Sequence, residues 1–251
     1  MLNTQVKREW FGEWFDSPYY HILYKHRDFE EARAFIQSLD KLLDFKPEHK
    51  ILDLACGKGR HSIYMNSIGL DVVGVDLSPH NIAEAKKAEN DRLHFYVHDM
   101  REVFRKEAFD FVLNLFTSFG YFETEEENEK AICATAQGIK PGGNFVLDFL
   151  NPGFVIDRLV PCEEKEIDGI LFKISRRFAN GYILKDIEFE AEDRNFIFTE
   201  RVQAIQKEKF IGYFKKAGLS LQQIYGDYRL SPFEESSSER MIFILQKPLA
   251  R

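Results

Sequence analysis

The chain has 251 residues, 44% of them hydrophobic, which is enough for one sizeable α/β core without disulfide or metal staples. Its net charge of −7 and its scattered basic residues argue against nucleic acid as a substrate, because affinity for nucleic acid comes largely from neutralised phosphates. The three cysteines show no metal-ligand spacing, and no apolar run is long enough to span a membrane. We therefore expect a cytoplasmic protein with no metal site and no membrane partner.

Residues 1–45 form the first predicted segment, which is mainly helical and rich in aromatic side chains. The aromatic residues in question are Trp10, Phe11, Trp14, Phe15, Tyr19, Tyr20 and Tyr24. Two interpretations stay open for this segment. It could close over a binding site as a lid, or it could simply pack as helices against the rest of the fold.

Apolar strand-like runs alternate with helix-like segments between residues 50 and 151. The runs are ILDLA, DVVGVD, LHFYVHD, FDFVLNLF and NFVLDFLN. This alternation is typical of a doubly wound, mainly parallel sheet that carries helices on both faces. Within it, Ser78-Pro79 and the Thr124/Glu127 capping box each predict a helix start, and residues 141–143, Pro-Gly-Gly, predict a turn before the last run.

The pattern changes after residue 151, where polar and apolar residues alternate with a period of two. This change predicts a small antiparallel β excursion over residues 156–204. An amphipathic helix should follow over residues 207–218, with Phe210, Ile211 and Phe214 on its apolar face, and two final strands should come after it.

The segment LDLACGKGRHS, residues 52–62, carries the most informative motif. An apolar strand ends at Asp53, Gly57 and Gly59 follow, and a helix begins. Glycines permit a tight strand-to-helix turn and let a ligand approach the backbone closely. The loop therefore predicts a ligand site at this edge of the sheet.

Two further acids follow strand-like runs in chain order. Asp76 ends the second run, where a carboxylate can accept both hydroxyls of a ribose. Asp99-Met100 follows the third run, where the acid could accept from an adenine amino group. Each acid taken alone could also be an exposed carboxylate that caps a helix. The three acids in this order favour a nucleoside site.

With these motifs the chain resembles the class I (Rossmann-like) S-adenosylmethionine (SAM)-dependent methyltransferases, in particular small single-domain members that act on small molecules. The resemblance covers residues 50–151 and implies SAM as the cofactor. It implies that Asp53, Ala55, Cys56, Gly57 and Gly59 lie along the methionyl part, Asp76 and Leu77 at the ribose and adenine, Asp99 and Met100 at the adenine, and Leu115 and Phe116 beside the sulfonium. Ala55 departs from the family pattern, which has glycine there.

The resemblance also implies a seven-stranded sheet that ends in a reversed hairpin. The predicted fold class is thus α/β, with the antiparallel excursion after the fifth strand. We assign residues 46–155 and 205–251 to the SAM-binding domain, residues 156–204 to an insert over the pocket, and residues 1–45 to the amino-terminal segment. A homodimer paired through the insert is one alternative for the assembly.

For the reaction we expect in-line transfer of the SAM methyl group to an N, O or S atom of a small molecule. The catalytic residues stay unknown, and Tyr20, His21 and Tyr121 are the candidates near the acceptor, with Tyr19 beside them. Either His21 or His26 could act as a base, and Arg27 could contact the carboxylate of SAM. Cys56 is expected to pack beside the cofactor rather than to act as a nucleophile.

Three other functions remain as alternatives. A protein or nucleic-acid methyltransferase and a noncatalytic SAM-binding protein would share the same motifs. A nicotinamide-dependent oxidoreductase would suit the spacing between Gly57 and Asp76, but Ser62 stands where its fingerprint requires a third glycine.

Overall fold

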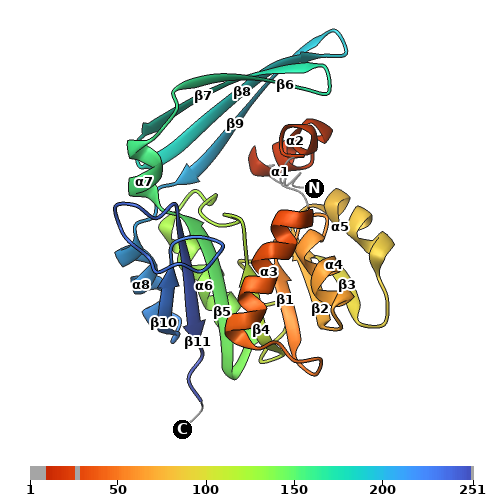
Figure 1. Cartoon of the computed structure of the whole chain (residues 1–251), viewed down its shortest axis with the longest axis vertical. Coiled ribbons are helices and arrows are strands. Elements are labelled where there is room, and N and C mark those ends of the chain that lie inside the picture. Colours follow the sequence, from red (N-terminus) through yellow and green to blue (C-terminus); the bar gives the residue numbers. More distant parts are fainter. Residues whose placement is uncertain (1–9, 26–28, 250–251) are drawn as a thin grey trace, which may run out of the picture.

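The computed structural model describes residues 10–25 and 29–249. Its central sheet has seven strands in the spatial order β10-β11-β5-β4-β1-β2-β3 (Figure 1). The strands are β1 (Lys50–Leu54), β2 (Asp71–Asp76), β3 (Leu93–Val97), β4 (Phe109–Asn114), β5 (Ile139–Leu150), β10 (Ser220–Tyr225) and β11 (Arg240–Gln246). β1 to β5 run parallel, and β11 runs antiparallel to both β5 and β10. The predicted fold class is confirmed.

Helices cover both faces of this sheet. One layer contains α3 (Phe29–Leu43), α4 (Arg60–Ser67) and α5 (Pro79–Ala85), which leads into a short 3-10 turn, and the other contains α6 (Glu125–Gly138) and α8 (Lys207–Lys216). Successive strand residues point to opposite faces, so Ile51 packs in the first layer and Leu52 in the second. Burial on both faces explains why these strands are almost continuously apolar.

Two predicted helix starts are confirmed. The Ser78 hydroxyl accepts a hydrogen bond from the Asn81 N–H at 2.9 Å, with Pro79 in the first turn of α5. At α6, the Thr124 hydroxyl and the Glu127 carboxylate each accept from the other residue's backbone N–H. Local sequence therefore sets where these helices begin.

Two local predictions are wrong. Residues 141–143 form no turn between elements, since they lie within β5: the Gly142 N–H donates to the Lys247 carbonyl at 2.8 Å, and the Lys247 N–H donates to Gly143 at 2.9 Å. Pairing with the chain after β11 thus continues the ladder through them. On α8, Ile211 is 39% exposed and Tyr213 takes the buried place beside Phe210, because residues three apart share a helix face.

The antiparallel excursion follows α7 (Pro152–Asp157). It is a sheet of four strands in chain order: β6 (Cys162–Ile167), β7 (Ile170–Ala179), β8 (Tyr182–Ala191) and β9 (Arg194–Gln203). Figure 1 shows this sheet beyond the carboxyl end of β5, with α1 (Trp10–Phe15) and α2 (Pro18–Leu23) between it and the central domain. The excursion and α1–α2 therefore lie over the edge at which the parallel strands end.

The amino-terminal helices are held on both sides. Trp14 is 1% exposed and donates from Nε1 to the Glu200 carboxylate of β9 at 2.7 Å, and the Tyr24 hydroxyl donates to the same carboxylate at 2.7 Å. In the opposite direction, the Ser78 hydroxyl at the start of α5 donates to the Asp16 carboxylate. The segment between α1 and α2 thus connects the antiparallel sheet to the central domain. The side chains of Trp10 and Phe11 lie outside the described part.

Within residues 10–25 and 29–249, none of the helices combines the length and the hydrophobicity that a membrane-spanning segment needs.

Gly74, in the middle of β2, gives a test of the packing between β2 and β3. A Cβ at this position would lie 2.5 Å from the Phe95 ring, which is fully buried and cannot move aside. We expect Gly74→Ala to lower the free energy of unfolding by about 1–3 kcal/mol, measured by urea denaturation.

Gly212→Ala is the matched control for that substitution. Gly212 lies inside α8, and an added Cβ would meet nothing within 4 Å. This change should stabilise the chain by roughly 0.5–1 kcal/mol. Equal stability of Gly74→Ala and the wild type would contradict the packing described here.

Candidate functional site

The glycine loop, residues 55–59, connects β1 to α4 at the carboxyl edge of the sheet. Its two glycines have different roles. A Cβ on Gly59 would lie 2.7 Å from the Phe95 ring, so Gly59 is required by packing, whereas a Cβ on Gly57 would meet nothing within 4 Å. The backbone at Gly57 therefore faces open space that a ligand could fill.

Ala55 adopts the left-handed conformation with φ of 63°, like Gly57 and Gly59 with φ of 56° and 82°. This conformation costs a non-glycine residue about 1 kcal/mol. Ala55 therefore fits this loop in the left-handed conformation, although the family pattern has glycine at this position.

Asp53 is 1% exposed and is the last residue but one of β1, just before the loop. Burial raises the pKa of its carboxyl to about 6, although the Ser62 hydroxyl donates to it at 2.5 Å. Ser62, the residue that departs from a dinucleotide fingerprint, therefore serves to hold this carboxylate. A buried acid of this kind destabilises the fold at neutral pH and suits a positively charged ligand.

Asp76 lies beside the same loop, at the end of β2. Its carboxylate accepts from the Gly57 N–H and from the Ser78 N–H, each at 2.9 Å. Burial raises its pKa despite these two hydrogen bonds. The negative charge of Asp76 also contributes to the raised pKa of Asp53, so two carboxylates repel each other at this edge.

Asp99 and Met100 follow β3 and reach the same edge, since the His98 N–H donates to the Asp76 carbonyl at 2.9 Å. The Asp99 carboxylate accepts from Arg101 Nε at 3.0 Å and from Arg101 Nη2 at 2.6 Å. Burial alone would raise the pKa of Asp99, but the Arg101 guanidinium outweighs burial and lowers it. The sequence analysis did not identify Arg101, which fixes this side chain.

The strand-four turn, residues 115–117, follows β4 beside β1. Leu115 is buried, while Phe116 and Thr117 are left-handed with φ of 59° and 58°. The Phe116 ring stacks on Tyr228 at 4.9 Å, and the Arg60 guanidinium lies 4.2 Å from the same ring. Two adjacent non-glycine residues in this conformation cost about 1–3 kcal/mol each, so the surroundings must impose it.

Two buried polar side chains near this edge were missed from the sequence. Neither His61 Nε2 nor Asn114 Oδ1 has a hydrogen-bond partner among the described residues. Burial lowers the pKa of His61 to about 3, which leaves its imidazole neutral. Such unsatisfied groups call for a water or a ligand. The signal available for Asn114 was a polar residue inside the apolar run FDFVLNLF.

The three acceptor-side candidates are brought close to one another by the amino-terminal helices. The Phe15 ring lies 5.3 Å from Tyr121 and 5.1 Å from Tyr20, and the Tyr20 ring lies 5.3 Å from His21. Burial, followed by the positive charge of Lys58 in the glycine loop, lowers the pKa of His21 to about 4. His26 and Arg27 lie outside the described residues.

Cys56 is 6% exposed inside the glycine loop. Burial, followed by the charges of Asp53 and Asp76, raises the pKa of its thiol well above the ordinary value. It is therefore held as the neutral thiol, which is a poor nucleophile.

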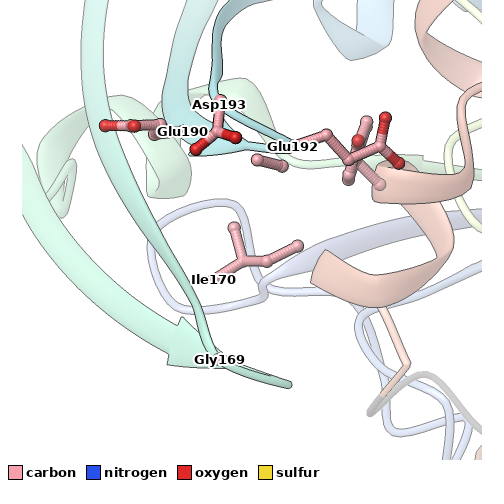
Figure 2. Close-up of a pocket in the computed structure, with 7 residues that line it drawn as sticks. Gly169, Ile170, Glu190, Glu192 and Asp193 are labelled. Atoms are coloured by element: carbon pink, nitrogen blue, oxygen red, sulfur yellow. The ribbon is translucent and has the colours of Figure 1, made fainter.

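A separate hollow of about 480 Å³ lies between two turns of the antiparallel sheet, at the end that points away from the central domain. Figure 2 shows Glu190, Glu192 and Asp193 along one side of it and Gly169 and Ile170 along the other. The three acids are exposed, so this hollow lacks the buried polar groups of a binding site. In the part of the chain that the structure covers, no three His, Cys, Asp or Glu side chains are grouped as metal ligands.

The part of the chain that supplies these strand-end residues matches a known family. Residues 51–143 match the family model described as a methyltransferase domain. A curated relative from Streptomyces venezuelae, dTDP-3-amino-3,4,6-trideoxy-alpha-D-glucopyranose N,N-dimethyltransferase, is 26% identical over 82% of this chain and 91% of its own length.

Two solved structures share the fold. One is a SAM-dependent methyltransferase from Clostridium acetobutylicum, with a TM-score of 0.77 and 18% identity over 92% of this chain and 96% of that one. The other is SAM-bound CalS10, an amino pentose methyltransferase from Micromonospora echinaspora, with a TM-score of 0.71 and 20% identity over 92% and 97%. The family match identifies a methyltransferase domain in residues 51–143, and the overall fold is that of class I SAM-dependent methyltransferases.

Proposed function

We propose that this enzyme methylates a small molecule, and that an amine is the acceptor. One observation carries the proposal: the buried carboxylate of Asp53 and the half-buried carboxylate of Asp76 repel each other beside a loop whose Gly57 backbone faces open space. Without a ligand, these charges lower the stability of the folded chain, and a cationic ligand that also carries hydroxyl donors would offset them.

SAM fits these residues. Its amino-acid ammonium would offset the buried charge of Asp53, and its ribose hydroxyls would donate to the Asp76 carboxylate, which two backbone N–H groups hold in place. Leu77, Asp99 and Met100 would hold the adenine. Leu115 and Phe116 would lie at the reactive end, near the unsatisfied oxygen of Asn114. When bound, SAM supplies a methyl group on a positively charged sulfur.

The chain's own contribution to the reaction is orientation and exclusion of water. The rings of Phe15, Tyr20 and Tyr121 would line the acceptor side, and α1 and α2 would cover it. His21 stays neutral at pH 7 because its pKa is about 4, and its Nε2 has no partner among the described residues. It could therefore accept a hydrogen bond from an acceptor N–H and orient the nitrogen lone pair.

The preference for an amine is supported by the relatives, because the Streptomyces enzyme and CalS10 are both described as methyltransferases of amino sugars. A small acceptor is favoured over a protein or a nucleic acid since α1, α2 and the antiparallel sheet cover the edge of the site (Figure 1), and since the net charge is −7. The absence of cysteine pairing among Cys56, Cys133 and Cys162 agrees with a cytoplasmic location.

Asp76→Asn tests the cofactor site. We expect its affinity for S-adenosylhomocysteine to fall about ten- to a hundred-fold in calorimetric titration, because charge-assisted hydrogen bonds to the ribose are lost. Asp71→Asn, at the other end of the same strand, is the matched control and should bind like the wild type. Binding of NADH in place of S-adenosylhomocysteine would overturn the proposal.

Asp53→Asn tests the cost of the buried acid. Because the pKa of Asp53 is raised from 3.8 to about 6, its stabilising contribution is complete below pH 3.8 and is lost as the pH rises through 6. At pH 7.5 the variant should be more stable than the wild type by about 2–3 kcal/mol in urea denaturation, and near pH 4 this gain should largely disappear. Its affinity for S-adenosylhomocysteine should nevertheless fall.

Asp110→Asn is the opposite control for this pH dependence. Burial would raise the pKa of Asp110, but hydrogen bonds from Lys140 and from the Lys50 N–H lower it. Removing this carboxylate should therefore destabilise the chain, and more so at neutral than at acid pH. A gain in stability for Asp53→Asn that is the same at both pH values would contradict the electrostatic account.

The acceptor can be sought by incubating the enzyme and SAM with pools of amino sugars, amino acids and simple amines, and measuring S-adenosylhomocysteine formation. Tyr20→Ala should lower kcat/KM for the acceptor about ten-fold or more while cofactor affinity stays the same. Tyr96→Ala, at a partly exposed position of β3, should leave both unchanged. Tight cofactor binding with no turnover in any pool would favour the noncatalytic alternative.

A further inference from the structure

The two left-handed residues of the strand-four turn are held by side chains from outside the turn. The Phe116 N–H donates to Asp148 Oδ2 at 2.7 Å, and the Thr117 N–H donates to the Asp148 carbonyl at 3.2 Å. Asp148 lies on β5 and is completely buried. One residue of the neighbouring strand therefore engages both amides of the turn.

Arg240, the first residue of β11, completes this arrangement. Its Nε donates to Asp148 Oδ1 at 2.8 Å, and its Nη2 donates to the Thr117 hydroxyl at 2.7 Å. A planar guanidinium can make both contacts at once, which a lysine ammonium cannot do with the same geometry. Arg240 thus fixes the carboxylate and the turn relative to each other.

The same turn reaches the glycine loop through the Phe116 ring. Arg60 begins α4 immediately after Gly59, and its guanidinium lies 4.2 Å from that ring, while Tyr228 stacks on it at 4.9 Å. The position of the turn is therefore coupled to the loop that lies on the other side of the cofactor site.

From these contacts we propose that Asp148 and Arg240 are positioning residues for methyl transfer, which hold the strand-four turn against the reactive end of the bound cofactor. This inference rests on the proposed function. Neither residue needs to touch SAM, because they act through the backbone of Phe116 and the side chain of Thr117. This role explains why Asp148, a charged residue, lies within the apolar run NFVLDFLN.

The test is calorimetric titration with S-adenosylhomocysteine of three variants. Thr117→Val removes the hydroxyl that accepts from Arg240 without changing the shape of the side chain, whereas Thr117→Ser keeps that hydroxyl. Arg240→Lys keeps the positive charge but removes the planar pair of donors. We expect affinity to fall on the order of ten-fold in Thr117→Val and Arg240→Lys, and to recover in Thr117→Ser.

Ile242→Val separates positioning from general stability. Ile242 is fully buried on β11 and pairs in register with Asp148, so its truncation should lower the melting temperature without changing affinity for S-adenosylhomocysteine. The losses of affinity in Thr117→Val and Arg240→Lys should also be non-additive when the two changes are combined, because both changes break the same hydrogen bond between Arg240 and Thr117.

Unchanged affinity in Thr117→Val and Arg240→Lys would overturn the inference alone. An affinity that follows melting temperature across all variants, Ile242→Val included, would also overturn it, because the effect would then be one of stability. Failure of the wild-type chain to bind S-adenosylhomocysteine would overturn the proposed function, and this inference with it.

Discussion

The burial of Asp53 at the end of β1 is the constraint around which the site is arranged. An ionised carboxylate in this place opposes folding at neutral pH, and its neighbour Asp76 adds to the cost. Hydrogen bonds from Ser62 and from the glycine loop reduce that cost without removing it. The remaining imbalance is what a cationic ligand can offset, so the same charges that weaken the empty fold would strengthen binding.

The second half of the site depends on contacts between elements that are distant in sequence. The strand-four turn keeps an unfavourable backbone conformation because Asp148 of β5 and Arg240 of β11 hold it. The amino-terminal helices keep their place because Glu200 of the antiparallel sheet binds Trp14 and Tyr24. In both cases the hydrogen bonds of one carboxylate, buried in Asp148 and partly buried in Glu200, fix a segment whose position the local sequence does not determine.

The two interpretations of the aromatic segment are compatible in the structure. Trp14 and Tyr19 pack against the antiparallel sheet, whereas Phe15 and Tyr20 lie between that sheet and Tyr121 of the central domain. The segment also contacts the central domain, through the hydrogen bond from Ser78 to Asp16 and through the Phe15–Tyr121 ring contact at 5.3 Å. We propose that the segment covers the acceptor side of the site.

The sequence by itself determined the doubly wound sheet, the helix starts at Ser78 and Thr124, and the order of Asp53, Asp76 and Asp99, because each of these depends on local periodicity, capping or strand ends. It could not determine the buried face of α8 or the strand continuing through residues 141–143, which pairing and packing partners decided. Only the tertiary structure revealed the roles of His61, Arg101, Asp148 and Arg240, since a side chain's partner across the sheet leaves no mark on the residues beside it in the chain.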